Sequence, residues 1–128
     1  MRSHVEFRSQ ALLEQDTDDP GESVARLLVE RLSECGYQIK EAVPEDWGWR
    51  IDIGNAAFPL WVGCGRYEQY DDGGYLVFID PSTPYVRRGL KRLATSETVE
   101  ALAGAIDQVL RQDGRVYEVR WWAEDEVR

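Results

Sequence analysis

The spacing of hydrophobic residues predicts two amphipathic helices in this chain. Between residues 22 and 35, and again between 96 and 110, apolar residues recur every three or four positions, which places them on one helical face. Acidic residues lie in each first turn, and Gly36 and Gly114 follow the last turns. The two apolar stripes consist of Val24, Leu27, Leu28, Leu32 and Cys35, and of Val99, Leu102, Ala103, Ile106, Val109 and Leu110.

Strict alternation of apolar and polar residues predicts the strands. The clearest segment is 47–53, where every second residue is apolar, so that Trp47 and Trp49 are expected on the same side. The sequence Asp-Gly-Gly at 72–74 is typical of a tight turn between two strands. The strands predicted in this way are 37–43, 47–53, 58–67, 75–80 and 116–122.

The order of these elements predicts an α+β fold. One helix precedes about four consecutive strands, and the second helix separates these from the last strand. Short turns between consecutive strands favour antiparallel pairing, and two amphipathic helices can cover one face of such a sheet. We therefore expect a two-layer sandwich, with a mainly antiparallel sheet of about five strands and both helices on one face.

The length of the chain, 128 residues, is typical of a single domain that buries a core without metal ions or disulfides. We expect residues 1–20 to form a short edge strand and an acidic loop, and residues 123–128 to form a polar tail. The N-terminal residues do not form an apolar leader segment, and the two cysteines are not closely spaced. These features favour a cytoplasmic protein with free thiols.

The second face of the sheet depends on the segment FPLWVGCG at 58–65. Alternation sends Cys64 toward the core, and it puts Trp61 on the opposite face together with Gly63 and Gly65. The two glycines are expected to leave a hollow beside Trp61, and Trp122 is expected on the same face. An aromatic floor with charged neighbours is typical of a binding surface. The alternative is that residues 81–95 fold back and cover this face.

The charge of the chain limits its partners. The net charge is −9, which opposes binding to nucleic acids and to anionic membranes but suits a basic protein partner. Solubility alone is another explanation for such a charge. One basic cluster contrasts with the rest of the chain, because Arg87, Arg88, Lys91 and Arg92 lie within six residues. This cluster could hold an anion or an acidic segment, or it could form internal ion pairs.

Few residues suit catalysis. Cys64 would need an activating base, and the single histidine, His4, is far away in the sequence. One histidine and two separated cysteines do not form a zinc-binding pattern, and we expect no metal ion or cofactor. Carboxylates near predicted turns could form an acid–base pair or a weak cation site, although solvated turn residues have the same pattern. These carboxylates are Asp46, Glu68, Asp71, Asp72 and Asp80.

The motifs EDWGW, FPLWVGCG, PSTPYVRR and RWW together resemble a family of small uncharacterised bacterial proteins with the pattern EDWGW, FPLWxGCG, PxxPYxRR and RWW. The resemblance covers about residues 37–122, which is most of the predicted domain. It implies a bacterial or phage origin and agrees with an α+β fold. It implies no catalytic role for any residue.

Three functions are compatible with these patterns. The first is a non-enzymatic protein of the immunity or inhibitor type that binds a basic protein partner. The second is a small-molecule or anion-binding protein that uses Arg50, Arg87 and Arg88 with Trp61. The third is an enzyme that uses carboxylates in an unknown reaction. The residues predicted to bind a protein partner are Trp47, Trp61, Tyr67, Tyr70, Asp71, Asp72 and Trp122.

Overall fold

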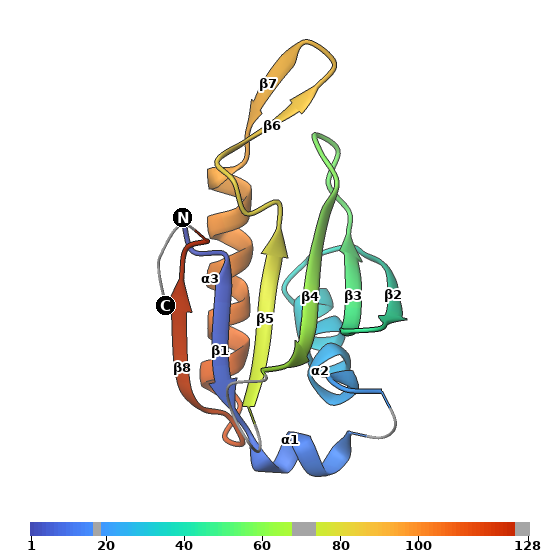
Figure 1. The fold of residues 1–128 in the computed structure, drawn as a ribbon, viewed down its shortest axis with the longest axis vertical. Helices are drawn as coiled ribbons and strands as arrows, with labels where there is room; N and C mark the ends of the chain where they lie inside the picture. The colour runs from blue at the N-terminus through green and yellow to red at the C-terminus, as the bar shows by residue number, and fades with distance from the viewer. Residues whose placement is uncertain (17–18, 68–73, 125–128) are drawn as a thin grey trace.

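The computed structural model of the chain describes residues 1–16, 19–67 and 74–124. Its centre is an open six-stranded sheet with the strand order β2-β3-β4-β5-β1-β8, in which every neighbouring pair is antiparallel (Figure 1). The predicted α+β class and antiparallel sheet are confirmed. The six strands are β1 (His4–Arg8), β2 (Ile39–Glu45), β3 (Gly48–Ile53), β4 (Leu60–Arg66), β5 (Gly74–Asp80) and β8 (Tyr117–Trp122).

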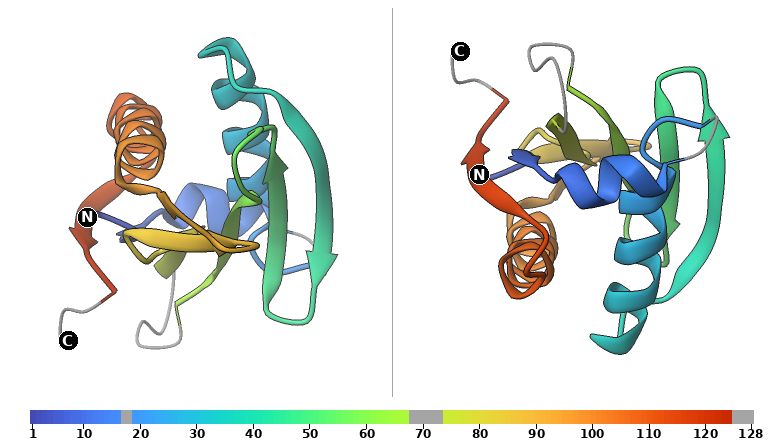
Figure 2. Two further views of the ribbon diagram at one scale, coloured as in Figure 1. Left: turned by 90° about the horizontal axis from the view of Figure 1, so that it is seen from above. Right: turned by 90° about the horizontal axis from the view of Figure 1, so that it is seen from below.

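Three helices accompany the sheet in the described part of the chain, which also forms a separate two-stranded hairpin. The two longer helices, α2 and α3, both pack on the same face of the sheet (Figure 2). None of the described helices is long and apolar enough to cross a membrane. The helices are α1 (Gln10–Gln15), α2 (Glu22–Glu34) and α3 (Ser96–Gln112), and the hairpin consists of β6 (Tyr85–Arg88) and β7 (Lys91–Ala94).

The core lies between the helices and the sheet face that they cover. The apolar stripes of α2 and α3 supply Leu28 and Leu102, which are fully buried. The sheet supplies alternate residues such as Ile51 and Val62, so the predicted alternation is confirmed in β3 and β4. The thiol of Cys64 is also buried in this cluster, as the alternation predicted.

The first strand lies inside the sheet rather than at its edge. β1 pairs with β5 on one side and with β8 on the other, so the predicted edge strand was wrong. Polar residues alternate with the buried Val5 and Phe7, which is the pattern of any strand with one covered face. A strand of five residues therefore contains no signal for its position within the sheet.

The segment predicted as an acidic loop contains the short helix α1. Ser9 caps this helix, because its hydroxyl accepts a hydrogen bond of 3.1 Å from the backbone amide of Leu12. Asp16 ends it and is held in place, since its carboxylate accepts hydrogen bonds from the Tyr75 hydroxyl (2.7 Å) and the Ser23 amide (2.8 Å). An acidic residue here fixes the joint between α1 and α2, which charge density alone does not predict.

Trp47 lies on the opposite face of the sheet from Trp49, contrary to the prediction. Between them, Gly48 has a φ of +151°, and a Cβ at this position would lie 2.1 Å from the carbonyl oxygen of Cys64. Glycine tolerates this conformation, and the chain uses it to break the alternation. Trp49 packs against the core, whereas Trp47 contacts Trp61 and Phe78 on the helix-free face.

The predicted connection at 81–95 contains the β6–β7 hairpin. Its two-residue turn has Gly89 at a φ of +64°, which suits the first turn position of a hairpin of this length. Figure 1 shows the hairpin projecting beyond the end of the sheet. It therefore does not cover the helix-free face beside Trp61, which was one of the two alternatives for this segment.

Candidate functional site

A row of aromatic side chains crosses the helix-free face of the sheet. The strand register places Phe78 of β5 opposite Gly63 of β4 and opposite His4 of β1, and His4 in turn opposite Trp122 of β8. Neighbouring rings along this row lie close enough to pack. The centroid distances are 5.9 Å for His4–Phe78, 5.4 Å for His4–Trp122, 5.5 Å for Trp61–Phe78, 5.4 Å for Trp47–Phe78, 6.0 Å for Trp47–Trp61 and 6.2 Å for Tyr67–Trp122.

The two glycines of FPLWVGCG let this row approach the backbone. A Cβ at position 63 would lie 2.3 Å from the ring of Phe78, and one at position 65 would lie 2.6 Å from the carbonyl oxygen of Trp47. The space predicted beside Trp61 is therefore largely filled by Phe78 and by the backbone at Trp47. The glycines allow the aromatic residues to pack closely on β4.

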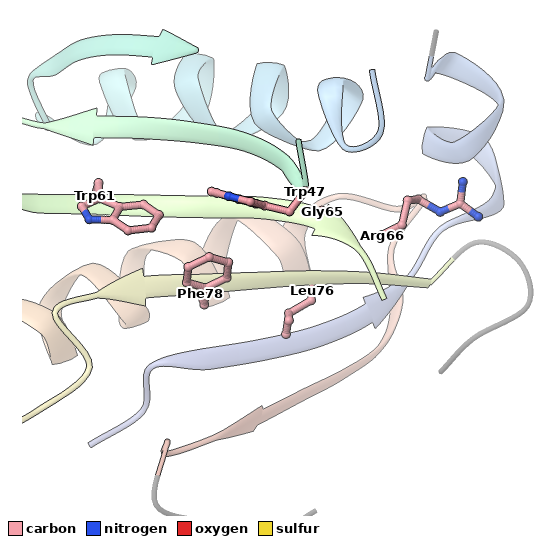
Figure 3. A pocket seen from close by; sticks show the side chains of 6 residues that line it. All are labelled: Trp47, Trp61, Gly65, Arg66, Leu76 and Phe78. Atoms are coloured by element: carbon pink, nitrogen blue, oxygen red, sulfur yellow. The ribbon is translucent and has the colours of Figure 1, made fainter. Parts of the chain in front are cut away.

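A shallow hollow remains on the surface of this row. We call it the Trp47–Trp61 hollow; its volume is about 280 Å³ (Figure 3). Trp47 is 44% exposed, and Figure 3 shows the Arg66 guanidinium directed away from the aromatic rings. The interior is therefore mainly apolar. The residues that line the hollow are Trp47, Trp61, Gly65, Arg66, Leu76 and Phe78.

The predicted partner-binding residues separate into three groups. Trp47 and Trp61 line the hollow and are accessible from it. Tyr67 and Trp122 contact each other elsewhere in the row, where Trp122 is only 8% exposed and supports the row from within the protein. Tyr70, Asp71 and Asp72 lie outside the described residues.

The three arginines predicted to bind an anion lie in two places. Arg50 is on the helix-free face, where its guanidinium lies 3.3 Å from the Asp52 carboxylate and 3.5 Å from that of Glu45. Arg87 and Arg88 line a different cavity, at the base of the β6–β7 hairpin. Neither Arg50 nor Trp61 lines that cavity, so the structure does not assemble the predicted pocket.

The groups considered for catalysis are dispersed or inaccessible. Burial raises the pKa of the Cys64 thiol well above its usual range, so the reactive thiolate is strongly disfavoured. Asp46 is an exposed residue of the β2–β3 turn, and Asp80 ends β5. Within 1–16, 19–67 and 74–124, no three His, Cys, Asp or Glu side chains gather as a metal site would need. Glu68 lies outside the described residues.

Sequence reasoning missed Phe78, Leu76 and Arg66 in the hollow and His4 in the aromatic row. Segment 75–80 is apolar on both sides, so its alternation does not distinguish the covered face from the helix-free one. The signal that identifies Phe78 is the register of the β4–β5 hairpin, because this register places it opposite a glycine. A large ring beside a glycine fills the gap that the missing side chain leaves.

No protein-family model matches this chain, and no curated protein or solved structure is significantly similar to it. The resemblance to the family with the EDWGW and FPLWxGCG motifs therefore stays a prediction.

Proposed function

We propose that this chain is a non-catalytic binding protein that docks a basic protein partner on the Trp47–Trp61 hollow. The observation that carries the proposal is the half-exposed indole of Trp47, which lies on a packed base formed by Trp61 and Phe78. Exposed tryptophans held rigidly by their neighbours are typical of the residues that dominate binding energy in protein interfaces. A fixed ring also loses little conformational entropy when a partner covers it.

The shape of the hollow favours a protein over a small molecule. Its volume of about 280 Å³ is below the range of roughly 300–1,000 Å³ that is usual for small-molecule pockets. It lies on an open sheet face, where a protein surface can extend beyond the hollow along the aromatic row. An apolar side chain, or the aliphatic part of a long one, would fill the centre.

The charge of the chain favours a basic partner. The net charge of −9 would speed the approach of a positively charged protein. Arg50, on the same face, forms ion pairs with the carboxylates of Glu45 and Asp52, so its charge is compensated. An Arg or Lys of the partner could also stack on the exposed ring of Trp47. By analogy of fold class and charge alone, such a protein would be of the immunity or inhibitor type and would act in the cytoplasm, where its two free cysteines remain reduced.

Truncation of one exposed aromatic residue tests this proposal. The tagged protein would capture its partner from a lysate of the source organism, and the affinity of the purified partner would then be measured by calorimetry. We expect Trp47→Ala to weaken binding at least tenfold, or about 1.4 kcal/mol, because hot-spot truncations cost more than this. Raising the salt concentration should also weaken binding, because charge attraction contributes to it.

Tyr85→Ala provides a matched control, because Tyr85 is similarly exposed (47%) but lies on the β6–β7 hairpin. It should bind the partner as the unmodified protein does. Equal affinities of Trp47→Ala and the unmodified protein would refute the proposal, as would equal losses in both variants. Urea unfolding of each variant shows whether a loss of affinity reflects a loss of folded protein.

A further inference from the structure

A second concave site lies at the base of the β6–β7 hairpin. Its volume is about 610 Å³, within the range of small-molecule sites. The hairpin, the β3–β4 connection at 54–59 and the end of β5 surround it, and β2 contributes Lys40. Its walls therefore come from three separate parts of the chain, namely residue 40 and residues 55–59 and 80–88. This cavity is distinct from the Trp47–Trp61 hollow, since the two share no lining residue.

Three cationic side chains line the cavity. Lys40, Arg87 and Arg88 line it, and Asp80 is the one carboxylate among its lining residues. The side chains therefore bring a net charge of +2 to the cavity. None of the three cations forms an ion pair with a described residue, so the predicted internal ion pairing of the basic cluster is not found within the described ranges. A net charge of +2 in the cavity, on a chain of net charge −9, attracts a compact anion.

Apolar side chains also line the cavity. They are Phe58 and Pro59, which precede β4, and Pro81 and Val86 near the hairpin. These side chains cannot satisfy the hydrogen bonds of an anion, but they can remove an apolar group from water. The cavity thus offers both cationic and apolar side chains to one ligand.

Hydrogen bonds hold one of the three cations, Arg88, in position. The Nη1 atom of Arg88 donates to the carbonyl oxygens of Ala56 (3.1 Å) and Ala57 (3.0 Å), which ties the hairpin to the β3–β4 connection. The side chain of Asn55 donates to the carbonyl oxygen of Phe58 (3.0 Å) and closes that connection on itself. A guanidinium has five N–H donors, so Arg88 keeps donors for a ligand after making these two bonds.

The geometry points to this cavity as a binding site for a phosphomonoester with an apolar body. A phosphomonoester carries a charge of about −1.5 to −2 at pH 7, which matches the side-chain charge of the cavity. Its oxygens would accept hydrogen bonds from Arg87 and Arg88, and the ester group would lie on Pro59 and Val86. Inorganic phosphate has no apolar group, so it could interact only with the cationic side chains. This site is independent of the proposed function, since it needs neither Trp47 nor a protein partner.

Calorimetric titration with three probes tests this inference. The probes are phenyl phosphate, inorganic phosphate and phenol, each titrated into the full chain at low ionic strength. Phenyl phosphate can contact both the cationic and the apolar side chains of the cavity. It should therefore bind with a Kd of roughly 1 mM or lower and about tenfold more tightly than inorganic phosphate. Phenol should not bind measurably.

Two arginine variants locate the binding. Arg87→Gln removes a cation that lines the cavity, and it should weaken phenyl phosphate binding at least fivefold. Arg92→Gln removes the same charge from the cross-strand partner of Arg87, which does not line the cavity, and should weaken binding less than twofold. Both residues are exposed, so neither variant should unfold the protein.

The inference is refuted by any of three results. Phenyl phosphate that fails to bind at 10 mM contradicts the site itself, on the affinity expected above. Equal affinities for inorganic phosphate and phenyl phosphate would show that the apolar side chains of the cavity do not contribute to binding. Equal effects of Arg87→Gln and Arg92→Gln show that the probe responds only to the overall charge of the hairpin. None of these results affects the test of Trp47, so the two proposals succeed or fail separately.

Discussion

At the scale of single residues, the contact between Gly63 and Phe78 determines how the helix-free face is built. The ring of Phe78 occupies the position that a side chain at 63 would take. It also contacts Trp47, Trp61 and His4, so three aromatic contacts depend on one missing Cβ. The glycine is required here for space, because its backbone does not adopt a positive φ.

Replacement of this glycine tests the contact. Gly63→Ala should lower the free energy of unfolding by about 1–3 kcal/mol, because the added methyl group must displace the Phe78 ring. Urea unfolding followed by circular dichroism measures the change. Gly114→Ala is the matched control, since a Cβ there meets no atom within 4 Å, and it should change stability by less than about 0.5 kcal/mol. Similar stabilities of the two variants would contradict the packing described above.

His4 makes the stability of the row dependent on pH. Burial between the rings of Phe78 and Trp122 lowers the pKa of His4 below its ordinary value of 6.5, and the charge of Glu124 opposes this effect more weakly. The unfolded chain therefore binds a proton more readily than the folded one. It follows that the contribution of His4 to stability is fully present above about pH 6.5 and is lost as the pH decreases below that value.

The measurement is the free energy of unfolding in urea between pH 7.5 and 5.5, for the unmodified protein and for His4→Gln. The variant lacks the titrating group but keeps all carboxylates, so it should lose less stability over this range. The difference between the two slopes isolates the contribution of His4. Parallel pH profiles would show that the row does not disfavour the charged imidazole.

At the scale of elements, the β6–β7 hairpin is attached to the body of the protein at identifiable points. Arg88 bonds to the β3–β4 connection, and the amide of Thr95 donates to the carbonyl oxygen of Pro84 at the base (2.9 Å). Within the hairpin, the guanidinium of Arg92 lies 4.0 Å from the centre of the Tyr85 ring. The hairpin is therefore a supported element, although it projects from the sheet.

Loss of the Arg88 contacts should make local opening of the β6–β7 hairpin easier without affecting the rest of the protein. Arg88→Ala is expected to speed amide hydrogen exchange of residues 85–94, because local opening no longer breaks two hydrogen bonds. Global stability should change by less than about 1 kcal/mol, since exposed hydrogen bonds contribute little. Lys91→Ala, at the cross-strand partner of Arg88, should leave the exchange unchanged. Equal exchange rates in both variants would show that Arg88 does not anchor the hairpin.

Periodicity predicts which face of an element is covered, but it does not predict strand order, a very short helix or a local break in the alternation. The helix stripes and the alternation of β3 and β4 were readable because each has one face in the core. The position of β1 depends on pairing with two distant strands, and α1 is too short to show a helical period. The face of Trp47 depends on a single backbone angle at Gly48.

In the candidate sites, too, some residues were predicted from the sequence and others were not. Trp47 and Trp61 were predicted from residue type and now line one hollow. Arg87 and Arg88 were predicted as a pair, and they do share a cavity. Their neighbours Lys40 and Phe58 could not be predicted, because they come from segments that only the folded chain brings to the hairpin.

At the scale of the whole molecule, the two faces of the sheet differ, because one packs against the helices and the other holds the aromatic row. Both long helices pack on one face and supply the core, so the other face is available for the aromatic row (Figure 2). The hairpin cavity is lined by the hairpin, the end of β5 and the β3–β4 connection, and Phe58 in its lining also belongs to the core. Substitution of Trp47 or Arg87, by contrast, removes no residue of the main core.

The charge of the molecule is also divided along its length. The hairpin carries four positive charges, so the remainder of the chain must carry −13 to give the total of −9. Because the hairpin lies at one end of the longest axis, the protein has an electric dipole along that axis (Figure 1). In the field of a charged partner such a molecule experiences a torque and rotates before contact. A basic surface would thus meet the body first, whereas an anion would meet the hairpin.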